Sequence, residues 1–240
     1  MFAIDTKNLT KKFKERIAVN EIDLKINQGE LFALLGTNGA GKTTTIKMLS
    51  TLILPTDGEI KINGLDIIKD RQKIKEILNV SPQETAIAPN LSVKENLEFM
   101  AGVYQISNKQ EKINELIKMF KLDEVLNQKA KTLSGGWQRK VSIAISLIKE
   151  PKILFLDEPT LGLDVIARKE LWTVIEKLKG KITIILTTHY MDDAETLSDR
   201  IGIMAKGKLI DVGTSKELIE KTGAKNFEDA FVKIATRGEL

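Results

Sequence analysis

A glycine-rich segment near the N-terminus carries the residue types that hold a phosphate chain. It follows the continuous apolar run Leu31–Leu35, which is typical of a strand buried on both faces. Glycines let a backbone wrap around phosphates, and the start of the helix expected after the segment adds a positive dipole end. The segment matches the pattern G-x-x-x-x-G-K-[ST] at every fixed position and consists of Gly36, Thr37, Asn38, Gly39, Ala40, Gly41, Lys42 and Thr43.

This pattern predicts a division of labour among the residues of the loop. We expect the backbone amides from Gly39 to Thr44 to point at the phosphates of a nucleotide. The Lys42 ammonium would reach the β- and γ-phosphates, and the Thr43 hydroxyl would ligate Mg²⁺.

Two carboxylates end a second buried run. Ile153–Leu156 is followed directly by Asp157 and Glu158, and the carboxyl ends of strands in an open α/β sheet form the ligand crevice. An aspartate there can hold Mg²⁺, and a glutamate beside it can polarise an attacking water. We expect the alternation of an extended backbone to point Glu158 away from the metal. His189, the only histidine, follows a third apolar run at the same expected edge, which favours a contact with the γ-phosphate.

The composition is that of a globular protein with a substantial core. The chain has 240 residues, 42% hydrophobic and 29% charged, which suits one α/β domain or a core with an inserted subdomain. The 37 basic and 33 acidic residues are interspersed, so they indicate solvated helix faces, and no nucleic acid is expected. The chain has no cysteine, which excludes disulfides and thiolate metal sites.

The apolar runs are short, and we expect no signal peptide. A membrane span needs roughly 18 consecutive apolar residues, and none of the runs approaches that length. The N-terminus lacks a basic segment followed by an apolar one. Any membrane role is therefore expected to come through a partner.

The periodicity of the sequence predicts an α/β core interrupted by a helical insertion. Residues 2–26 alternate like antiparallel strands with one solvated face, and buried runs alternating with helices favour a parallel sheet covered on both faces. Residues 86–150 are expected to be helical, with a capping box at Ser92–Glu95. The other expected elements are helices from the glycine-rich loop to about Leu52 and at 109–120, 165–178 and 215–234, and strands at 59–63, 201–204 and 208–212.

The glycine-rich loop, the segment Leu133–Gly136, the acidic strand end and His189 follow one another in a characteristic order and spacing. In this order the sequence resembles the ABC ATPase cassette over essentially the whole chain. The resemblance implies Glu158, His189 and Lys42 as catalytic residues and Thr43, Gln83 and Asp157 as Mg²⁺ ligands. It also implies ATP contacts from Phe13 in the A-loop, the Walker A residues Gly36 to Thr44, Gln83 in the Q-loop, the signature residues Ser134, Gly135 and Gly136, and Asp164 in the D-loop.

The resemblance further implies a P-loop NTPase, RecA-like core with an antiparallel β subdomain and an inserted α-helical subdomain. Residues 1–240 would form a single cassette, with the core at about 1–87 and 151–240 and the helical subdomain at about 88–150. Two cassettes, identical or paralogous, would pack head-to-tail, with each ATP between the Walker A loop of one and the signature segment of the other. Gln83 would report the nucleotide state to a separate polytopic membrane permease.

The sequence departs from the family pattern at two places. Trp137 follows the second signature glycine where many cassettes have glutamine, and the D-loop begins with Leu161–Gly162 where serine and alanine are more usual. Ser134 and Asp164 are retained, so we expect activity to survive. Trp137 is expected to affect packing near the neighbouring helix.

The resemblance leaves more than one function open. Residues 43–52 and Phe227–Phe231 look like the drug, sodium and lipid-linked export subfamily, which implies an exporter subunit at the cytoplasmic face of the membrane, and the abundance of Lys and Ile hints at a bacterial source. The alternative is a soluble ABC ATPase that drives no transport, such as the iron–sulfur assembly type. A nucleotide sensor without turnover is disfavoured because Glu158 and His189 are both present.

Overall fold

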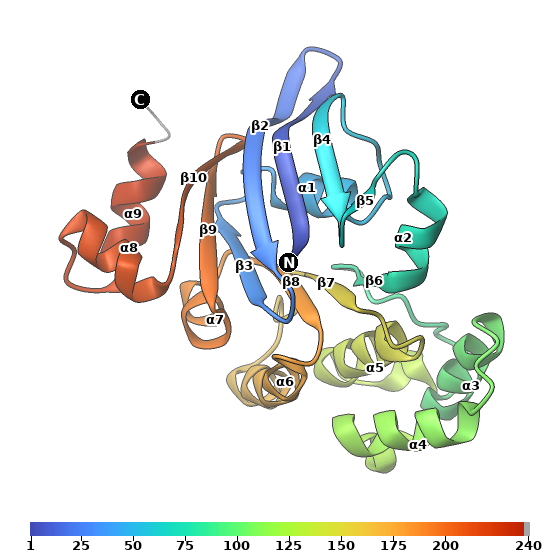
Figure 1. Cartoon of the computed structure of the whole chain (residues 1–240). Coiled ribbons are helices and arrows are strands. Elements are labelled where there is room, and N and C mark those ends of the chain that lie inside the picture. The colour runs from blue at the N-terminus through green and yellow to red at the C-terminus, as the bar shows by residue number, and fades with distance from the viewer. Residues whose placement is uncertain (238–240) are drawn as a thin grey trace.

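Two β-sheets form the framework of the protein (Figure 1). The structure is a computed structural model and describes residues 1–237. A four-stranded sheet has the order β2-β1-β4-β5, and a six-stranded sheet has the order β10-β9-β3-β8-β7-β6. The strands are β1 (Phe2–Phe13), β2 (Arg16–Asn27), β3 (Leu31–Gly36), β4 (Asp57–Ile62), β5 (Leu65–Asp66), β6 (Leu78–Ser81), β7 (Ile153–Asp157), β8 (Thr183–Thr188), β9 (Arg200–Ala205) and β10 (Lys208–Gly213).

The central strands β3, β7 and β8 of the six-stranded sheet are buried on both faces, as the apolar runs predict. Strands β6, β7, β8, β3 and β9 pair in parallel, and β10 adds an antiparallel edge to β9. Along β3 the buried side chains alternate between two hydrophobic clusters: Leu31, Ala33 and Leu35 belong to one, and Phe32 and Leu34 belong to the other. The carboxyl ends of the parallel strands therefore meet at one fixed edge.

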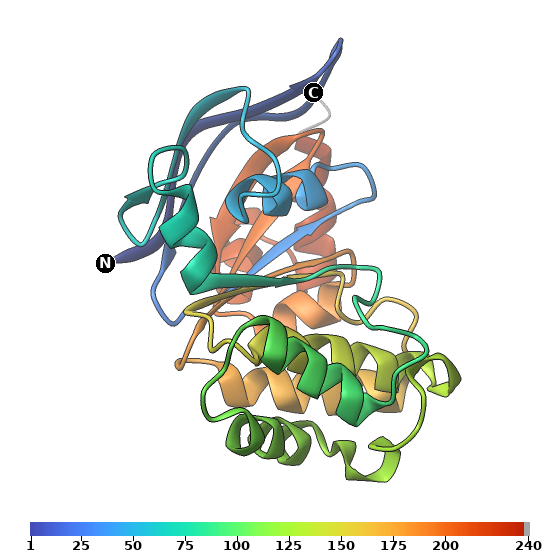
Figure 2. The same cartoon turned by 90° about the vertical axis from the view of Figure 1, so that its right-hand side faces the viewer.

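Helices cover these faces. Helix α1 packs between the two sheets, and α5, α6 and α7 lie on the other side of the six-stranded sheet (Figures 1 and 2). The α-helices are α1 (Lys42–Leu49), α2 (Arg71–Ile77), α3 (Val93–Val103), α4 (Lys109–Phe120), α5 (Gly135–Leu147), α6 (Val165–Leu178), α7 (Met191–Leu197), α8 (Ser215–Thr222) and α9 (Phe227–Arg237); two short 3-10 helices span Leu122–Val125 and Ala130–Thr132.

Helices α3, α4 and α5, here called the helical region, lie at the far end of the molecule from the β1–β2 turn (Figures 1 and 2). Helix α3 begins with the expected capping box, because Ser92 Oγ accepts from Glu95 N and Glu95 Oε2 accepts from Ser92 N. Helices α4 and α6 have the expected bounds. The division of the chain into a core and a helical subdomain at about 88 and 150 stays a prediction.

Several expected elements differ from the structure in detail. Helix α1 ends at Leu49 and not near Leu52, because Thr51 turns the chain with a φ of 65°. The expected helix at 215–234 is two helices, α8 and α9, separated at Gly223, whose φ is 60°. The sequence analysis missed the short elements β5, β6 and α7. Within residues 1–237, no helix is both long enough and apolar enough to cross a membrane.

Candidate functional site

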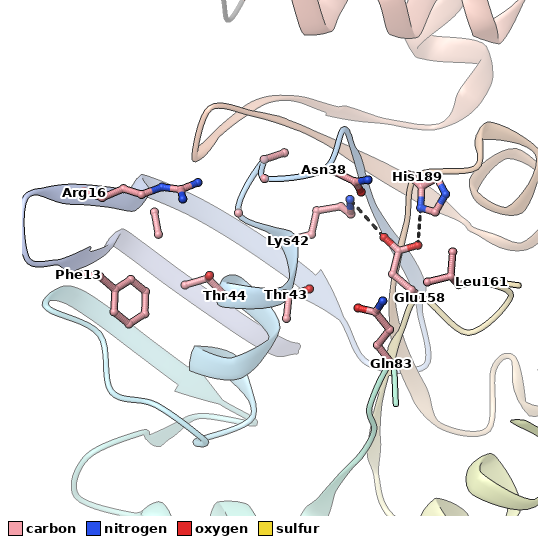
Figure 3. Close-up of a pocket in the computed structure, with 14 residues that line it drawn as sticks. Phe13, Arg16, Asn38, Lys42, Thr43, Thr44, Gln83, Glu158, Leu161 and His189 are labelled. Atoms are coloured by element: carbon pink, nitrogen blue, oxygen red, sulfur yellow. Dashed lines mark hydrogen bonds and ion pairs between the residues drawn. The ribbon is translucent and has the colours of Figure 1, made fainter. Parts of the chain in front are cut away.

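The glycine-rich loop between β3 and α1 borders a cleft of about 580 Å³ (Figure 3). Gly41 has a φ of 103°, and a Cβ atom there would lie 2.6 Å from the Ala18 carbonyl oxygen, so only glycine fits. The loop therefore passes so close to the backbone of β2 that there is no room for a side chain at this position. The cleft is lined by Phe13, Arg16, Ala18, Asn38, Gly39, Ala40, Gly41, Lys42, Thr43, Thr44, Gln83, Glu158, Leu161 and His189.

Lys42 and His189 converge on the carboxylate of Glu158 (Figure 3). Lys42 Nζ lies 3.3 Å from Glu158 Oε1, and His189 Nδ1 lies 2.8 Å from Glu158 Oε2. Lys42 Nζ also donates to the Gly36 carbonyl oxygen at 2.7 Å, which holds the ammonium over the loop. Lys42 is 5% exposed and Glu158 is 6% exposed, so both charges act in a largely water-excluded place.

The two adjacent carboxylates point in different directions, but not for the reason that the sequence suggested. Asp157 Oδ1 accepts from Thr43 Oγ1 at 3.2 Å and from Thr187 Oγ1 at 2.6 Å, beneath the loop. The expected alternation of an extended backbone is wrong, because β7 ends at Asp157 and Glu158 has a φ of 49°, in the left-handed region. Thr187 holds this strained backbone by accepting from Glu158 N through its carbonyl at 3.2 Å and its hydroxyl at 3.0 Å.

Thr43 and Asp157, beneath the loop, can supply part of the ligand shell of a magnesium ion. Within residues 1–237, no group of three or more His, Cys, Asp or Glu side chains could form a metal cage. Mg²⁺ in nucleotide sites is held by one or two protein oxygens, with phosphates and waters completing its shell. The Thr43 hydroxyl and the Asp157 carboxylate, 3.2 Å apart, are such a donor set, and Gln83 lines the same cleft.

Arg139 of α5 connects the helical region to the segment that carries Gln83 and to the backbone of Glu158. Its guanidinium donates to the Pro82 carbonyl oxygen at 2.7 Å, to the Gln83 carbonyl oxygen at 2.5 Å and to the Glu158 carbonyl oxygen at 3.4 Å. Burial lowers the pKa of Arg139 from its ordinary value, and the negative charge of Asp157 opposes that shift. The position of Gln83 is therefore tied to α5.

Phe13 lies at the opposite end of the cleft from His189 (Figure 3). Phe13 is 49% exposed, and the Lys11 ammonium lies 5.2 Å from the centroid of its ring. Sequence reasoning missed Arg16 and Ala18, which also line the cleft, and named Leu161 only as the start of the D-loop. Arg16 could have been found, because the tight turn after Phe13 makes it the cross-strand partner of that residue.

The remaining predicted residues lie outside this cleft. Ser134 and Gly135 are exposed at the start of α5, Gly136 follows them, and the Asp164 carboxylate caps α6 by accepting from Ile166 N at 2.9 Å and Ala167 N at 3.0 Å. Gly36 and Thr37 line a neighbouring cavity of about 260 Å³ together with Asn38, His189 and Phe231.

The Trp137 ring lies against Lys140, a residue of the same helix α5. The Lys140 ammonium lies 4.3 Å from the Trp137 ring centroid and 2.6 Å from Glu170 Oε2 of α6. Lys140 thus links the signature segment to α6.

Comparison with curated proteins gives long matches to transporter components. The chain is 42% identical over 227 residues to human phospholipid-transporting ATPase ABCA3, and this match covers 92% of the chain and 13% of ABCA3. It is 40% identical over 239 residues to the probable multidrug ABC transporter ATP-binding protein YbhF of Escherichia coli K12, which covers 96% of this chain and 41% of YbhF. The chain thus spans less than half the length of these two relatives.

Solved structures share the fold over most of the chain. An ATP-binding subunit of an ABC transporter superposes with a TM-score of 0.86 at 27% identity, covering 97% of this chain and 99% of that one. A dimeric post-hydrolysis structure of the ATP-binding cassette MJ0796 bound to ADP and Pi has a TM-score of 0.78 at 27% identity, covering 88% and 98%. The ABC transporter family model matches residues 19–161. These matches confirm the resemblance and the predicted fold class, and the chain belongs to the ABC transporter family as an ATP-binding cassette with a P-loop NTPase core.

Proposed function

We propose that this chain binds and hydrolyses ATP as the nucleotide-binding subunit of an exporter whose membrane-spanning permease is a separate chain. The observation that carries the enzymatic part is the placement of Glu158 between Lys42 and His189, at the end of the phosphate-loop cleft. A carboxylate held there can act on a water beside the terminal phosphate, and the loop can hold the phosphates in place.

The cleft fits ATP along its length. Phe13 offers an exposed aromatic face at one end, on which the adenine ring would stack. The amides from Gly39 to Thr44 would hold the phosphates at the start of α1, and Lys42 would pair with the β- and γ-phosphates. Arg16 adds a positive charge beside the path between base and phosphates.

Thr43 and Asp157 would hold Mg²⁺, with Gln83 completing the protein ligands. The ion, when bound, would neutralise charge on the phosphate oxygens. Glu158 would then accept a proton from the attacking water, and His189 would hold the Glu158 carboxylate in place and contact the γ-phosphate. Lys42 would stabilise the charge that develops on the transferred phosphoryl group.

A second cassette would complete the site. The cleft would leave one face of the terminal phosphate open. Ser134 and Gly135 lie exposed at the start of α5, followed by Gly136, with amides and a hydroxyl that can bind an anion. The match to the dimeric MJ0796 cassette supports the pairing of two cassettes. The pairing would be head-to-tail, with Asp164 at the same interface. ATP would then join the two copies, and its hydrolysis would release them.

The transport part of the proposal rests on the relatives. ABCA3 is named as a phospholipid-transporting ATPase, and YbhF is named as part of a probable multidrug transporter. The chain would work at the cytoplasmic face of a bacterial membrane, where the link between Gln83 and Arg139 would pass the nucleotide state to the permease.

Two measurements test the two parts separately. Phosphate release by the purified chain with MgATP tests hydrolysis, and absence of ATP-dependent release would contradict it. Affinity purification from native membranes tests transport: recovery of a polytopic membrane protein supports the exporter, whereas recovery of a soluble iron–sulfur scaffold would leave only the ATPase.

A further inference from the structure

Asp193 makes a concentrated set of polar contacts close to the catalytic residues. It lies in the first turn of α7, is 0% exposed, and does not line the phosphate-loop cleft. Its Oδ2 accepts from the hydroxyls of Thr160 and Thr188, the latter at 2.9 Å. Its Oδ1 accepts from Arg168 Nε and Trp172 Nε1, each at 2.8 Å. Four donors thus compensate for the burial of one carboxylate.

The two threonines belong to the two segments that matter for hydrolysis. Thr160 lies two residues after Glu158 and within the stretch that leads to Asp164, and Thr188 directly precedes His189. His189 Nδ1 lies 2.8 Å from Glu158 Oε2. Asp193 accepts from Thr188, which precedes His189, and from Thr160, which lies two residues after Glu158. These contacts therefore form a closed loop that begins and ends at the Glu158 segment.

The two carboxylate oxygens of Asp193 contact different parts of the structure. Tyr190 N donates to Thr188 Oγ1 at 3.0 Å, so the Thr188 proton is directed at Asp193. The Oδ1 side is anchored by α6, where the Arg168 guanidinium lies 4.9 Å from the centroids of both the Trp172 and Tyr190 rings. Helix α6 therefore fixes the carboxylate, and the carboxylate fixes the two threonines.

We infer that Asp193 is a positioning residue for ATP hydrolysis, which holds His189 and the segment from Thr160 to Asp164 in one fixed relation to Glu158. This inference rests on the proposed ATPase function and deepens it. It assigns to α6 and α7 a part in setting the reactive geometry, because a small displacement of a catalytic group lowers the rate steeply.

The test compares variants that each remove one hydrogen bond to the same carboxylate. Thr160→Val and Thr188→Val remove a bond on the motif side, and Trp172→Phe removes one on the anchoring side. Asp193→Ala removes all four, and Asp192→Ala, whose side chain is 77% exposed, removes the neighbouring charge as a control. The readouts are kcat and KM for MgATP, the Kd for ATP by fluorescence titration, and the melting temperature.

We expect kcat to fall about 10- to 100-fold in Thr160→Val, Thr188→Val and Asp193→Ala, with the Kd for ATP within about threefold of wild type. Trp172→Phe should lower kcat less than the valine variants do, because Arg168 Nε still donates to Asp193 Oδ1. Asp192→Ala should keep kcat within about twofold of wild type. If Asp193→Ala does not fold, the two valine variants decide the question alone.

Two results would overturn the inference while wild-type ATPase activity stands. One is full kcat in both valine variants. The other is an equal loss of kcat in Trp172→Phe and the valine variants that follows their melting temperatures, since that pattern indicates structural support only. A wild-type chain that does not hydrolyse ATP would instead overturn the proposed function and this inference with it.

Discussion

The phosphate-loop side and the signature side of this cassette are built in opposite ways. On the first, Lys42 is 5% exposed and Glu158 is 6% exposed, and both have charged partners within the chain. On the second, Ser134 and Gly135 are exposed, and within residues 1–237 the Ser134 side chain makes no capping hydrogen bond to α5. One half of the proposed ATP site is preorganised, and the other half presents backbone donors outward.

Two glycines express this difference. A Cβ atom on Gly41 would lie 2.6 Å from a backbone oxygen of β2. One on Gly135 would meet no atom of the described chain within 4 Å apart from its own residue, its chain neighbours and the nearby backbone of its own helix. Gly41 is therefore required by the fold of its own chain. Gly135 is free of that requirement, so a need for glycine there would come from a ligand or a second chain.

The largest expected effect is on the buried side. Glu158→Gln should lower the ATPase rate by about 10²- to 10⁴-fold, because it removes the proposed proton acceptor. ATP binding should persist, since the phosphate loop is unchanged. Phosphate release and equilibrium ATP binding check this, with the exposed Glu220→Gln as a matched control. A rate equal to wild type would show that Glu158 is not the base.

Lys42→Ala should weaken ATP binding by roughly 10- to 100-fold, which corresponds to the loss of one hydrogen bond to a charged group. The variant also leaves the buried Glu158 carboxylate without its ammonium partner. Isothermal titration with MgATP measures the affinity, and a Kd within twofold of wild type would contradict the assigned phosphate contact.

Gly135→Asp sharpens the comparison directly. We expect an unchanged melting temperature and unchanged ATP affinity of the monomer, but turnover at least about tenfold lower, because the new charge would repel phosphate across the interface. Gly41→Ala should instead destabilise the fold by about 1–3 kcal/mol, through strain at a φ of 103°. Normal turnover in Gly135→Asp would argue against pairing of two cassettes.

Phe13→Ala should raise the Kd for ATP about fivefold or more, since stacking of a base on an aromatic ring contributes roughly 1–3 kcal/mol. Because Phe13 is 49% exposed, removal of its ring should leave the melting temperature nearly unchanged. Titration with ATP and with inorganic triphosphate separates the two ends of the cleft: the triphosphate affinity should not change.

The smallest expected effect concerns acid stability. Hydrogen bonds from Ser92 and Thr214 lower the pKa values of Glu95 and Glu217 below the ordinary value of 4.5. A lowered carboxyl pKa gives stability that is present above the unfolded value and is lost as pH falls through the folded value. Melting temperatures of wild type, Glu95→Gln and Glu217→Gln should therefore differ at pH 7, and the difference should shrink as the pH falls below 4.5 and through the lowered pKa values of the folded state.

The local elements could be predicted because their signals are local. The capping box at Ser92, the amphipathic spacing of 109–120 and the buried runs of β3 and β7 each follow from backbone geometry and burial of one face. Helix α7 and strand β6 were missed because segments of that length carry too few residues for a period to show.

The sequence alone therefore determined the phosphate loop, the acidic strand end and the family, because each is a short pattern whose residue types serve one chemistry. The tertiary structure decided how they meet. It placed Glu158 in a left-handed conformation between Lys42 and His189 and gathered four donors around Asp193. These contacts join strands and helices distant in sequence, so they depend on sheet order and on packing across the core, which no local pattern encodes.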